Sequence, residues 1–164
     1  MKRETPIFTG VGTAIVTPFK NGKIDYEAYG KMIEFQIAGG VDSIVVCGTT
    51  GEAATLTDEE HRDIIAYTVK QVNKRVPVIA GTGSNDFAYA VDLSRHACEV
   101  GADALLHVTP YYNKTSQKGI VEYFSKIADA CSKPVILYNV PSRTGVNISI
   151  DAYRALAKHP NIIA

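Results

Sequence analysis

Residues 42–52 read DSIVVCGTTGE and join a short apolar run to a polar segment rich in glycine and threonine. An uninterrupted apolar run of this length is typical of a strand that is buried on both faces of a parallel sheet. The run leads into Thr49 and Thr50, which are bracketed by glycines, and then into Glu52. Such an exit suits either a tight turn into the next helix or a loop whose backbone and hydroxyls face a ligand.

The alternation of an apolar run with an amphipathic segment recurs along the whole chain. Each apolar run has the length of a strand, and each amphipathic segment has the length and spacing of a helix. This repeat predicts five βα units in a parallel sheet with right-handed crossovers. The apolar runs are GTAIVTPF (12–19), DSIVVCG (42–48), VPVIAGTG (76–83), DALLHVTPY (103–111) and KPVILYNVP (133–141).

Helix starts can be placed from capping residues. Asp25 is expected to cap the first helix. Thr57 and Glu60 have the spacing of a capping box at the start of the second helix, and Asn85 is expected to open the third. We expect two further helices at residues 119–131 and 149–159, and the first residues of a sixth strand at 161–164.

Two architectures share strict βα alternation, an open doubly wound sheet and a (β/α)8 barrel. The first strand is not followed by GxGxxG, which argues against a dinucleotide-binding sheet. Threonine, tyrosine and asparagine recur at the strand ends, in CGTT, GTGSN, VTPYYN and YNVPSRTG. In a barrel those ends converge on the face that carries the active site. We therefore predict an α/β chain of the (β/α)8 barrel type.

The chain covers about the first five units of such a barrel. A complete barrel needs ~250 residues, and this sequence reaches only the opening of strand six at residues 161–164. Two unpaired strand edges of a parallel sheet would invite aggregation. We expect residues 1–164 to form the N-terminal, incomplete part of a single barrel domain, or to pair with another chain that closes it.

Composition excludes several classes of partner. With 17 basic and 17 acidic residues the formal net charge is zero, so neither a nucleic acid nor an anionic membrane is an expected partner. No apolar stretch approaches the ~20 residues that span a bilayer. The N-terminus is interrupted by proline and glycine and makes a poor signal peptide. Three widely spaced cysteines predict buried, reduced thiols in a cytoplasmic protein.

Three strand-exit motifs carry a resemblance to a known family. GTTGE (48–52), TPYYNKTSQKG (109–119) and YNVPSRTG (138–145) resemble the dihydrodipicolinate synthase family of pyruvate-dependent class I aldolases, and the similarity runs from Phe8 to the last residue. The resemblance implies a lyase that condenses pyruvate with L-aspartate 4-semialdehyde through a lysine Schiff base, in diaminopimelate and lysine biosynthesis. It also implies no metal or other cofactor, and a homodimer or dimer of dimers.

The resemblance assigns roles to particular residues. Tyr138 resembles the general acid/base beside the Schiff base, and Thr49 the hydroxyl that relays protons. Tyr112 resembles the residue that completes this relay by reaching into a neighbouring subunit. Thr50 would hold the pyruvate carboxylate, and Arg143 the carboxylate of aspartate semialdehyde. N-acetylneuraminate lyase and the sugar-acid aldolases generally lack that arginine.

The resemblance also bears on inhibition by lysine. His61, Asn85 and Tyr111 match the site at which lysine inhibits some family members. Tyr89 replaces the glutamate of lysine-sensitive enzymes, and Asp58 replaces a histidine. We therefore expect weak or absent lysine feedback.

Glu52 is expected to be structural and to anchor backbone amides. The histidines show no metal-ligand spacing.

The Schiff-base lysine of the family would lie just past the last residue. Residues 161–164, NIIA, match the opening of the family pattern NIIAxKEA, which would place the lysine two residues after Ala164. Lys114 and Lys118 are expected in a solvated loop, and Lys133 at the opposite face. Three alternatives stay open: the inactive N-terminal part of a synthase, a catalytically dead half-barrel or interaction module, and another pyruvate-dependent aldolase.

Overall fold

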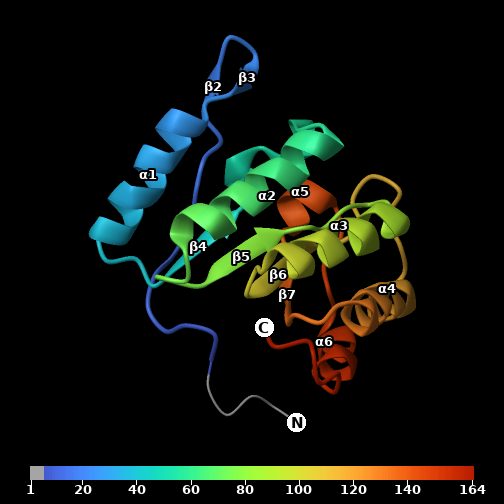
Figure 1. Cartoon of the computed structure of the whole chain (residues 1–164). Coiled ribbons are helices and arrows are strands. Elements are labelled where there is room, and N and C mark those ends of the chain that lie inside the picture. Colours follow the sequence, from blue (N-terminus) through green and yellow to red (C-terminus); the bar gives the residue numbers. More distant parts are fainter. Residues whose placement is uncertain (1–5) are drawn as a thin grey trace.

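The computed structural model describes residues 6–164 and shows one five-stranded parallel sheet in the order β1-β4-β5-β6-β7 (Figure 1). Each strand pairs with the next one along the chain, apart from a small hairpin that follows β1 and that we did not predict. The sheet strands are β1 (Gly12–Ala14), β4 (Ser43–Val46), β5 (Val78–Gly81), β6 (Ala104–Val108) and β7 (Val135–Tyr138), and the hairpin strands are β2 (Phe19–Lys20) and β3 (Lys23–Ile24).

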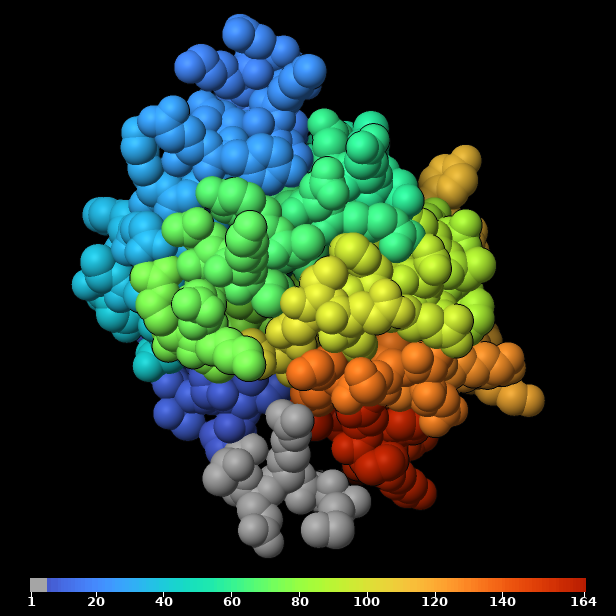
Figure 2. Space-filling model, in the orientation of Figure 1, coloured from blue at the N-terminus to red at the C-terminus, as the bar shows by residue number. Residues whose placement is uncertain are grey.

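A helix follows each strand of the sheet, and all helices except one short helix at the strand ends lie along one face in chain order (Figures 1 and 2). In the part of the chain that the structure describes, no helix is long and apolar enough to cross a membrane. The helices are α1 (Tyr26–Ala38), α2 (Asp58–Val72), α3 (Phe87–Val100), α4 (Gln117–Ala130), the short α5 (Pro141–Thr144) and α6 (Ile150–Leu156), with single 3-10 turns η1 (Thr49–Gly51) and η2 (Ala53–Thr55).

The helix starts follow from local capping, with one correction. Asp25 accepts a hydrogen bond from the backbone N–H of Ala28, and Thr57 and Glu60 form the predicted capping box. The third helix, however, is capped by Asp86 and not by Asn85, because the Asp86 carboxylate accepts the backbone N–H groups of the first turn.

The two faces of the sheet differ in their surroundings. Side chains alternate between the faces of a strand, and Ile44 and Val46 of β4 face the helices and are fully buried. Val45 of β4, Leu106 of β6 and Ile136 of β7 lie on the other face, outside the helix-covered core, and are only partly buried. A parallel sheet with helices on one face is the arrangement of a partial (β/α)8 barrel.

The last residues of the chain begin a sixth strand, as predicted. The carbonyl oxygens of Asn161 and Ala164 accept hydrogen bonds from Val135 N at 2.8 Å and Leu137 N at 2.7 Å. Ile163 N donates in return to Val135 O at 3.0 Å, and Ile162 makes a parallel bridge to Val135. The backbone of residues 161–164 therefore extends the ladder beyond β7.

A buried hydroxyl after β1 holds the turn that follows β4. Thr17 is 4% exposed, and its Oγ1 donates a 2.7 Å hydrogen bond to Gly51 O in η1. Without this donor the carbonyl of Gly51, which is also buried, would lose a partner that bulk water replaces poorly. The contact ties two segments 34 residues apart and positions the GTTGE turn over the end of the sheet.

A buried polar cluster lies between β6 and α3. His107 Nε2 is 2.9 Å from Thr82 Oγ1 and 3.0 Å from Ser94 Oγ. His107 Nδ1 has no hydrogen-bond partner among the described residues. Because charging this ring would be opposed by its complete burial, the pKa of His107 is lowered to about 3.

We predict that stability falls as the pH is lowered, through His107. In the unfolded chain its pKa is about 6.5, so between that value and about 3 the unfolded state binds more protons. The contribution is fully present above pH ~6.5, and about 2 kcal/mol of it should be lost by pH ~5. Urea unfolding of the wild type and His107→Gln across this range measures the effect. Equal pH slopes for the two proteins would contradict it.

We also predict that Thr17→Val destabilises the protein although it conserves the shape of the side chain. The buried Gly51 carbonyl would lose its donor, at a cost of about 1–3 kcal/mol in the free energy of unfolding. Thr13→Val, in β1 itself, is the matched control, because the structure shows no hydrogen bond from the Thr13 hydroxyl to residues 6–164. Urea unfolding should separate the two variants, and equal losses would show that the Thr17 bond is unimportant.

Candidate active site

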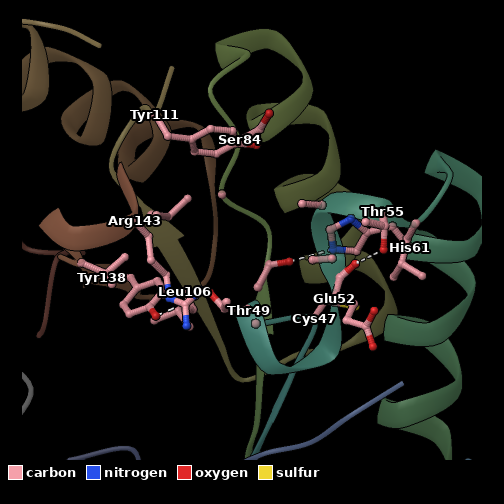
Figure 3. A pocket seen from close by; sticks show the side chains of 18 of the residues that line it. Cys47, Thr49, Glu52, Thr55, His61, Ser84, Leu106, Tyr111, Tyr138 and Arg143 are labelled. Carbon is pink, nitrogen blue, oxygen red and sulfur yellow. Dashed lines mark hydrogen bonds between the residues drawn. The ribbon is translucent and has the colours of Figure 1, made fainter. Parts of the chain in front are cut away.

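A cavity of about 520 Å³ lies at the carboxyl ends of the strands. The segments after β4, β5, β6 and β7 all contribute to it, as parallel strands require when their ends meet at one edge (Figure 3). Its lining is mixed, with polar groups set among apolar side chains, which is typical of a small-molecule site. The polar lining includes Thr49, Glu52, His61, Ser84, Tyr89, Tyr111, Tyr138 and Arg143.

Thr49 and Tyr138 lie next to each other although they are 89 residues apart in the sequence. Tyr138 is the last residue of β7, and Thr49 is the first residue of η1. Thr49 Oγ1 is 3.5 Å from the Tyr138 hydroxyl, at the outer limit for a hydrogen bond. Catalytic hydrogen bonds are often long in unliganded sites and shorten when substrate binds. The pair can pass a proton once the two oxygens approach.

Arg143 brings the positive charge of the site. It belongs to α5, which starts at Pro141 and is capped at its carboxyl end by Gly145 in a left-handed conformation. Buried Thr144 supports this turn through a 3.0 Å hydrogen bond from its hydroxyl to Val146 O. Within residues 6–164 Arg143 forms no ion pair, and Figure 3 shows it on the same side of the cavity as Tyr138. Its planar guanidinium can therefore bind a carboxylate bidentately.

The GTTGE turn has an unusual backbone. Cys47 and Glu52 have φ values of 54° and 57°, in the left-handed region that non-glycine residues rarely adopt. Gly81 allows the close approach of β5 to this turn, because a Cβ there would lie 2.0 Å from Cys47 O. Backbone outliers of this kind concentrate at functional sites.

Two of the residues predicted to act in catalysis or substrate binding lie outside the cavity lining. Thr50 is exposed in η1, and Tyr112 is 90% exposed, with a left-handed backbone. Tyr111 beside it does line the cavity. The assignments of Thr50 to the pyruvate carboxylate and of Tyr112 to a neighbouring subunit stay predictions.

Glu52 differs from the expectation that its carboxylate anchors backbone amides. The side chain is exposed and lines the cavity, and no described residue donates a hydrogen bond to its carboxylate. The backbone does the anchoring, since Glu52 O accepts a 2.9 Å hydrogen bond from the Thr55 hydroxyl. The left-handed conformation of Glu52 thus links η1 to η2.

His61, Asp58 and Tyr89 line another part of the cavity, across from Tyr138 (Figure 3 labels His61). His61 Nε2 is 2.8 Å from Gly81 O, and burial lowers the pKa of this ring. Both carboxylate oxygens of Asp58 accept a hydrogen bond from Arg62 Nε, at 2.9 and 3.0 Å, which lowers the pKa of the Asp58 carboxyl. Burial, followed by the nearby Asp58 charge, raises the pKa of Tyr89 to about 12.

Two of the three predicted effector-site residues line the same cavity. His61 and Tyr111 both line the cavity, and Asn85 does not. The carbonyl of Asn85 accepts a 3.1 Å hydrogen bond from Asn113 Nδ2. This contact joins the segment after β5 to the loop after β6, so that Asn85 supports the rim of the cavity through its backbone.

The sequence analysis did not identify the apolar part of the lining. Leu106 and Val108 line the cavity from β6, and Val140 lines it from the segment after β7. Leu106 and Val108 could have been predicted to share a face, because side chains at i and i+2 point to the same side of a strand. Val140 lies after β7, where the alternation of a strand gives no prediction of side-chain direction.

The described part of the cavity contains neither a lysine nucleophile nor a cluster of potential metal ligands. Among residues 6–164 no lysine lines the cavity. Lys114 packs beside Gly145, where a Cβ would lie 2.9 Å from Lys114 Cε, and is not part of the lining. Nor does the described part of the chain bring three His, Cys, Asp or Glu side chains together as potential metal ligands.

Comparison with known proteins places this site in a family. The model of the dihydrodipicolinate synthetase family matches residues 7–164. A 4-hydroxy-tetrahydrodipicolinate synthase of Acetivibrio thermocellus is 61% identical over 159 residues, which cover 97% of this chain and 54% of the relative. The chain thus spans about half the length of the curated relatives that it matches.

Solved structures agree in fold as well as in sequence. The dihydrodipicolinate synthase of Aquifex aeolicus superposes with a TM-score of 0.92 at 52% identity, over 94% of this chain and 53% of that one. The enzyme of Acinetobacter baumannii, whose crystal structure is a complex with pyruvate, superposes with a TM-score of 0.91 at 45% identity, over 96% of this chain and 54% of that one. The chain belongs to the dihydrodipicolinate synthetase family.

Proposed function

We propose that this chain supplies the proton-relay and carboxylate-binding half of a 4-hydroxy-tetrahydrodipicolinate synthase site. The observation that carries the proposal is the cavity in which Thr49, Tyr138 and Arg143 meet and which no described lysine lines. The names of the relatives support the reaction, and the relative from Acinetobacter baumannii supports pyruvate as one substrate. The nucleophile is expected two residues beyond Ala164.

The proposed reaction needs a neutral lysine amine and mobile protons. The amine adds to the ketone of pyruvate, water leaves, and an imine forms. Loss of a methyl proton then gives an enamine, whose carbon attacks the aldehyde of L-aspartate 4-semialdehyde. In this proposal Tyr138 gives and takes these protons and Thr49 passes them on, since a hydroxyl both donates and accepts; their 3.5 Å separation supports these roles. No cofactor is required.

The proposed lysine position follows from the ladder beyond β7. Residues 161–164 pair with β7, at whose end Tyr138 stands. A residue two positions after Ala164 would lie near the carboxyl end of the same strand pair, since strands advance ~3.3 Å per residue. Burial at that end of a barrel would lower the pKa of a lysine amine and favour its neutral form.

Arg143 and Thr50 are proposed to bind the two carboxylates of the substrates. The cavity-lining guanidinium of Arg143 has no acidic partner among the described residues, so it can receive the carboxylate of aspartate semialdehyde. Thr50 in the η1 turn would hold pyruvate by its hydroxyl and backbone N–H. Tyr112 would act from a neighbouring subunit of a cytoplasmic homodimer or dimer of dimers, which accords with its exposure.

We predict no Schiff base on the 164-residue chain. Borohydride reduction in the presence of pyruvate should leave the mass of this polypeptide unchanged. Residues 1–164 fused to the remaining C-terminal part of the Acetivibrio thermocellus synthase should gain one pyruvate adduct, on a lysine that follows residue 164. An adduct on any lysine of residues 1–164 would contradict the proposal. A folded fusion without an adduct would favour a catalytically dead half-barrel.

Within that fusion, Tyr138→Phe should slow adduct formation. Loss of a general acid/base typically costs about 10²- to 10⁴-fold in rate. Tyr153→Phe in α6 is the matched control, because Tyr153 packs against the core and does not line the cavity. The rate is followed by mass spectrometry of samples reduced at successive times. Equal rates for the two variants would remove Tyr138 from the proton path.

We further predict weak or absent feedback by L-lysine. The Asp58 carboxylate already binds Arg62, and the phenol of Tyr89 stays neutral because its pKa is raised to about 12. An effector ammonium would therefore find no unpaired carboxylate at these two positions. Initial rates of the fusion should hardly change with lysine, whereas Tyr89→Glu should introduce sensitivity. Strong inhibition of the unsubstituted fusion by sub-millimolar lysine would contradict this prediction.

A further inference from the structure

Two cysteines outside the cavity lie on neighbouring helices. Cys98 is in the last turn of α3, and Cys131 directly follows α4 as its C-cap. These helices pack together, and each follows a strand of the parallel sheet, so that they run in the same direction. Their carboxyl ends therefore lie side by side. Both thiols are unpaired and only partly buried, so a small oxidant can reach them.

The two thiols stand at the adjacent carboxyl ends of α3 and α4, and each affects the ionisation of the other. The hydrogen bond from Cys131 is the largest cause of a lowered pKa of the Cys98 thiol. The hydroxyl of Ser132 and the backbone N–H groups of Ser132 and Lys133 lower the pKa of the Cys98 thiol further. A sulfur surrounded by donors favours its thiolate, which is the reactive form.

The segment that carries Cys131 is held in place by one side chain. Asn161 Nδ2 lies 3.1 Å from Cys131 O, 3.0 Å from Lys133 O and 3.0 Å from Ala128 O. These contacts fix the turn after α4 against the start of the sixth strand. Cys131 thus lies in a turn that hydrogen bonds hold against the start of the sixth strand, next to the end of α3.

Cys47 provides an internal contrast. It is 3% exposed and follows β4, and burial raises the pKa of its thiol. Structural cysteines of this kind are unreactive. The third cysteine of the chain therefore serves as a reference against which the reactivity of the pair can be measured.

We propose that Cys98 and Cys131 form a reversible intramolecular disulfide when the protein meets hydrogen peroxide. The Cys98 thiolate attacks one peroxide oxygen, the O–O bond breaks, and the released hydroxide takes up a proton to become water. The sulfenic acid on Cys98 is then attacked by Cys131, the S–O bond breaks, and a second water leaves with the thiol proton. Two thiols lose two electrons, and one peroxide gives two waters.

The inference is independent of the proposed reaction, because neither cysteine lines the cavity. It departs from the expectation that all three thiols are buried, which holds for Cys47 alone. The disulfide would join α3 to the segment before β7. A dithiol such as dithiothreitol would reduce it by exchange and restore both thiols.

Peptide mapping of the folded 164-residue chain tests the proposal. After treatment with one equivalent of hydrogen peroxide and alkylation of the remaining thiols, trypsin should release peptide 96–114 linked to peptide 127–143. The linked species should be lighter than its two parts by two hydrogen atoms and should disappear on reduction. Cys47 should remain a thiol, which becomes alkylated once the protein is unfolded.

Variants test the order of the two steps. Cys131→Ser should accumulate a sulfenic acid on Cys98 that dimedone traps, whereas Cys98→Ser should leave Cys131 about tenfold less reactive or slower still. Cys47→Ala is the control and should keep the linked peptides. Three results with the unsubstituted chain would each overturn the proposal. The first is that Cys98 and Cys131 are alkylated separately after peroxide treatment, and the second is a disulfide between two chains. The third is an equal yield of disulfides that include Cys47.

Discussion

The parallel hydrogen-bonded ladder from β1 to β7 is the constraint on which the rest of the molecule depends. Because neighbouring strands are parallel and in chain order, their carboxyl ends meet at one edge of the sheet. Residues far apart in sequence, such as Thr49 and Tyr138, therefore meet at that edge. The helices on one face bury the apolar side chains that keep the ladder together.

Two close contacts convert this edge into a cavity. Gly81 lets the exit of β4 come within contact distance of β5, since any larger residue would collide with Cys47 O. Thr17 then holds the turn from the β1 side through Gly51 O. The turn requires left-handed backbone conformations at Cys47 and Glu52, which are unfavourable for residues other than glycine. The position of Thr49 thus rests on groups that need not touch a substrate themselves.

The cavity separates two kinds of electrostatic environment. Beside Tyr138, the Arg143 guanidinium has no acidic partner within the described chain. In the part lined by His61, Asp58 already binds Arg62 and burial lowers the pKa of His61, whereas the Glu52 carboxylate has no partner among the described residues. Anionic ligands are therefore favoured beside Tyr138, whereas in the second part the Asp58 carboxylate is already occupied and is not free to hold an ammonium group.

The fold could be predicted from the sequence because its signals are local and repeated. The capping box at Thr57 and the apolar strand runs needed no tertiary information. The β2–β3 hairpin was missed although Asn21-Gly22 is a strong turn signal, since its strands have only two residues each. Adjacent Asn85 and Asp86 can both cap a helix, and only the observed backbone distinguishes them.

The candidate site was predicted less completely, for a physical reason. Strand-end positions place Tyr138 and Arg143 at the correct edge of the sheet. The direction of a side chain within a single 3-10 turn depends on its backbone angles, which is why Thr49 lines the cavity and Thr50 does not. Contacts such as Thr17 to Gly51 join distant segments and leave no periodic trace in the sequence.

The central claim is that this chain contributes the proton relay around a pyruvate-derived imine. The most direct measurement is a crystal structure of the fusion with the Acetivibrio thermocellus C-terminal part, trapped by borohydride with pyruvate. The account predicts the adduct in the cavity beside Tyr138, its carboxylate at the Thr49–Gly51 turn, and a Thr49–Tyr138 distance below the present 3.5 Å. An adduct whose carboxylate lies away from that turn, with Tyr138 and Thr49 out of hydrogen-bonding reach, would contradict it.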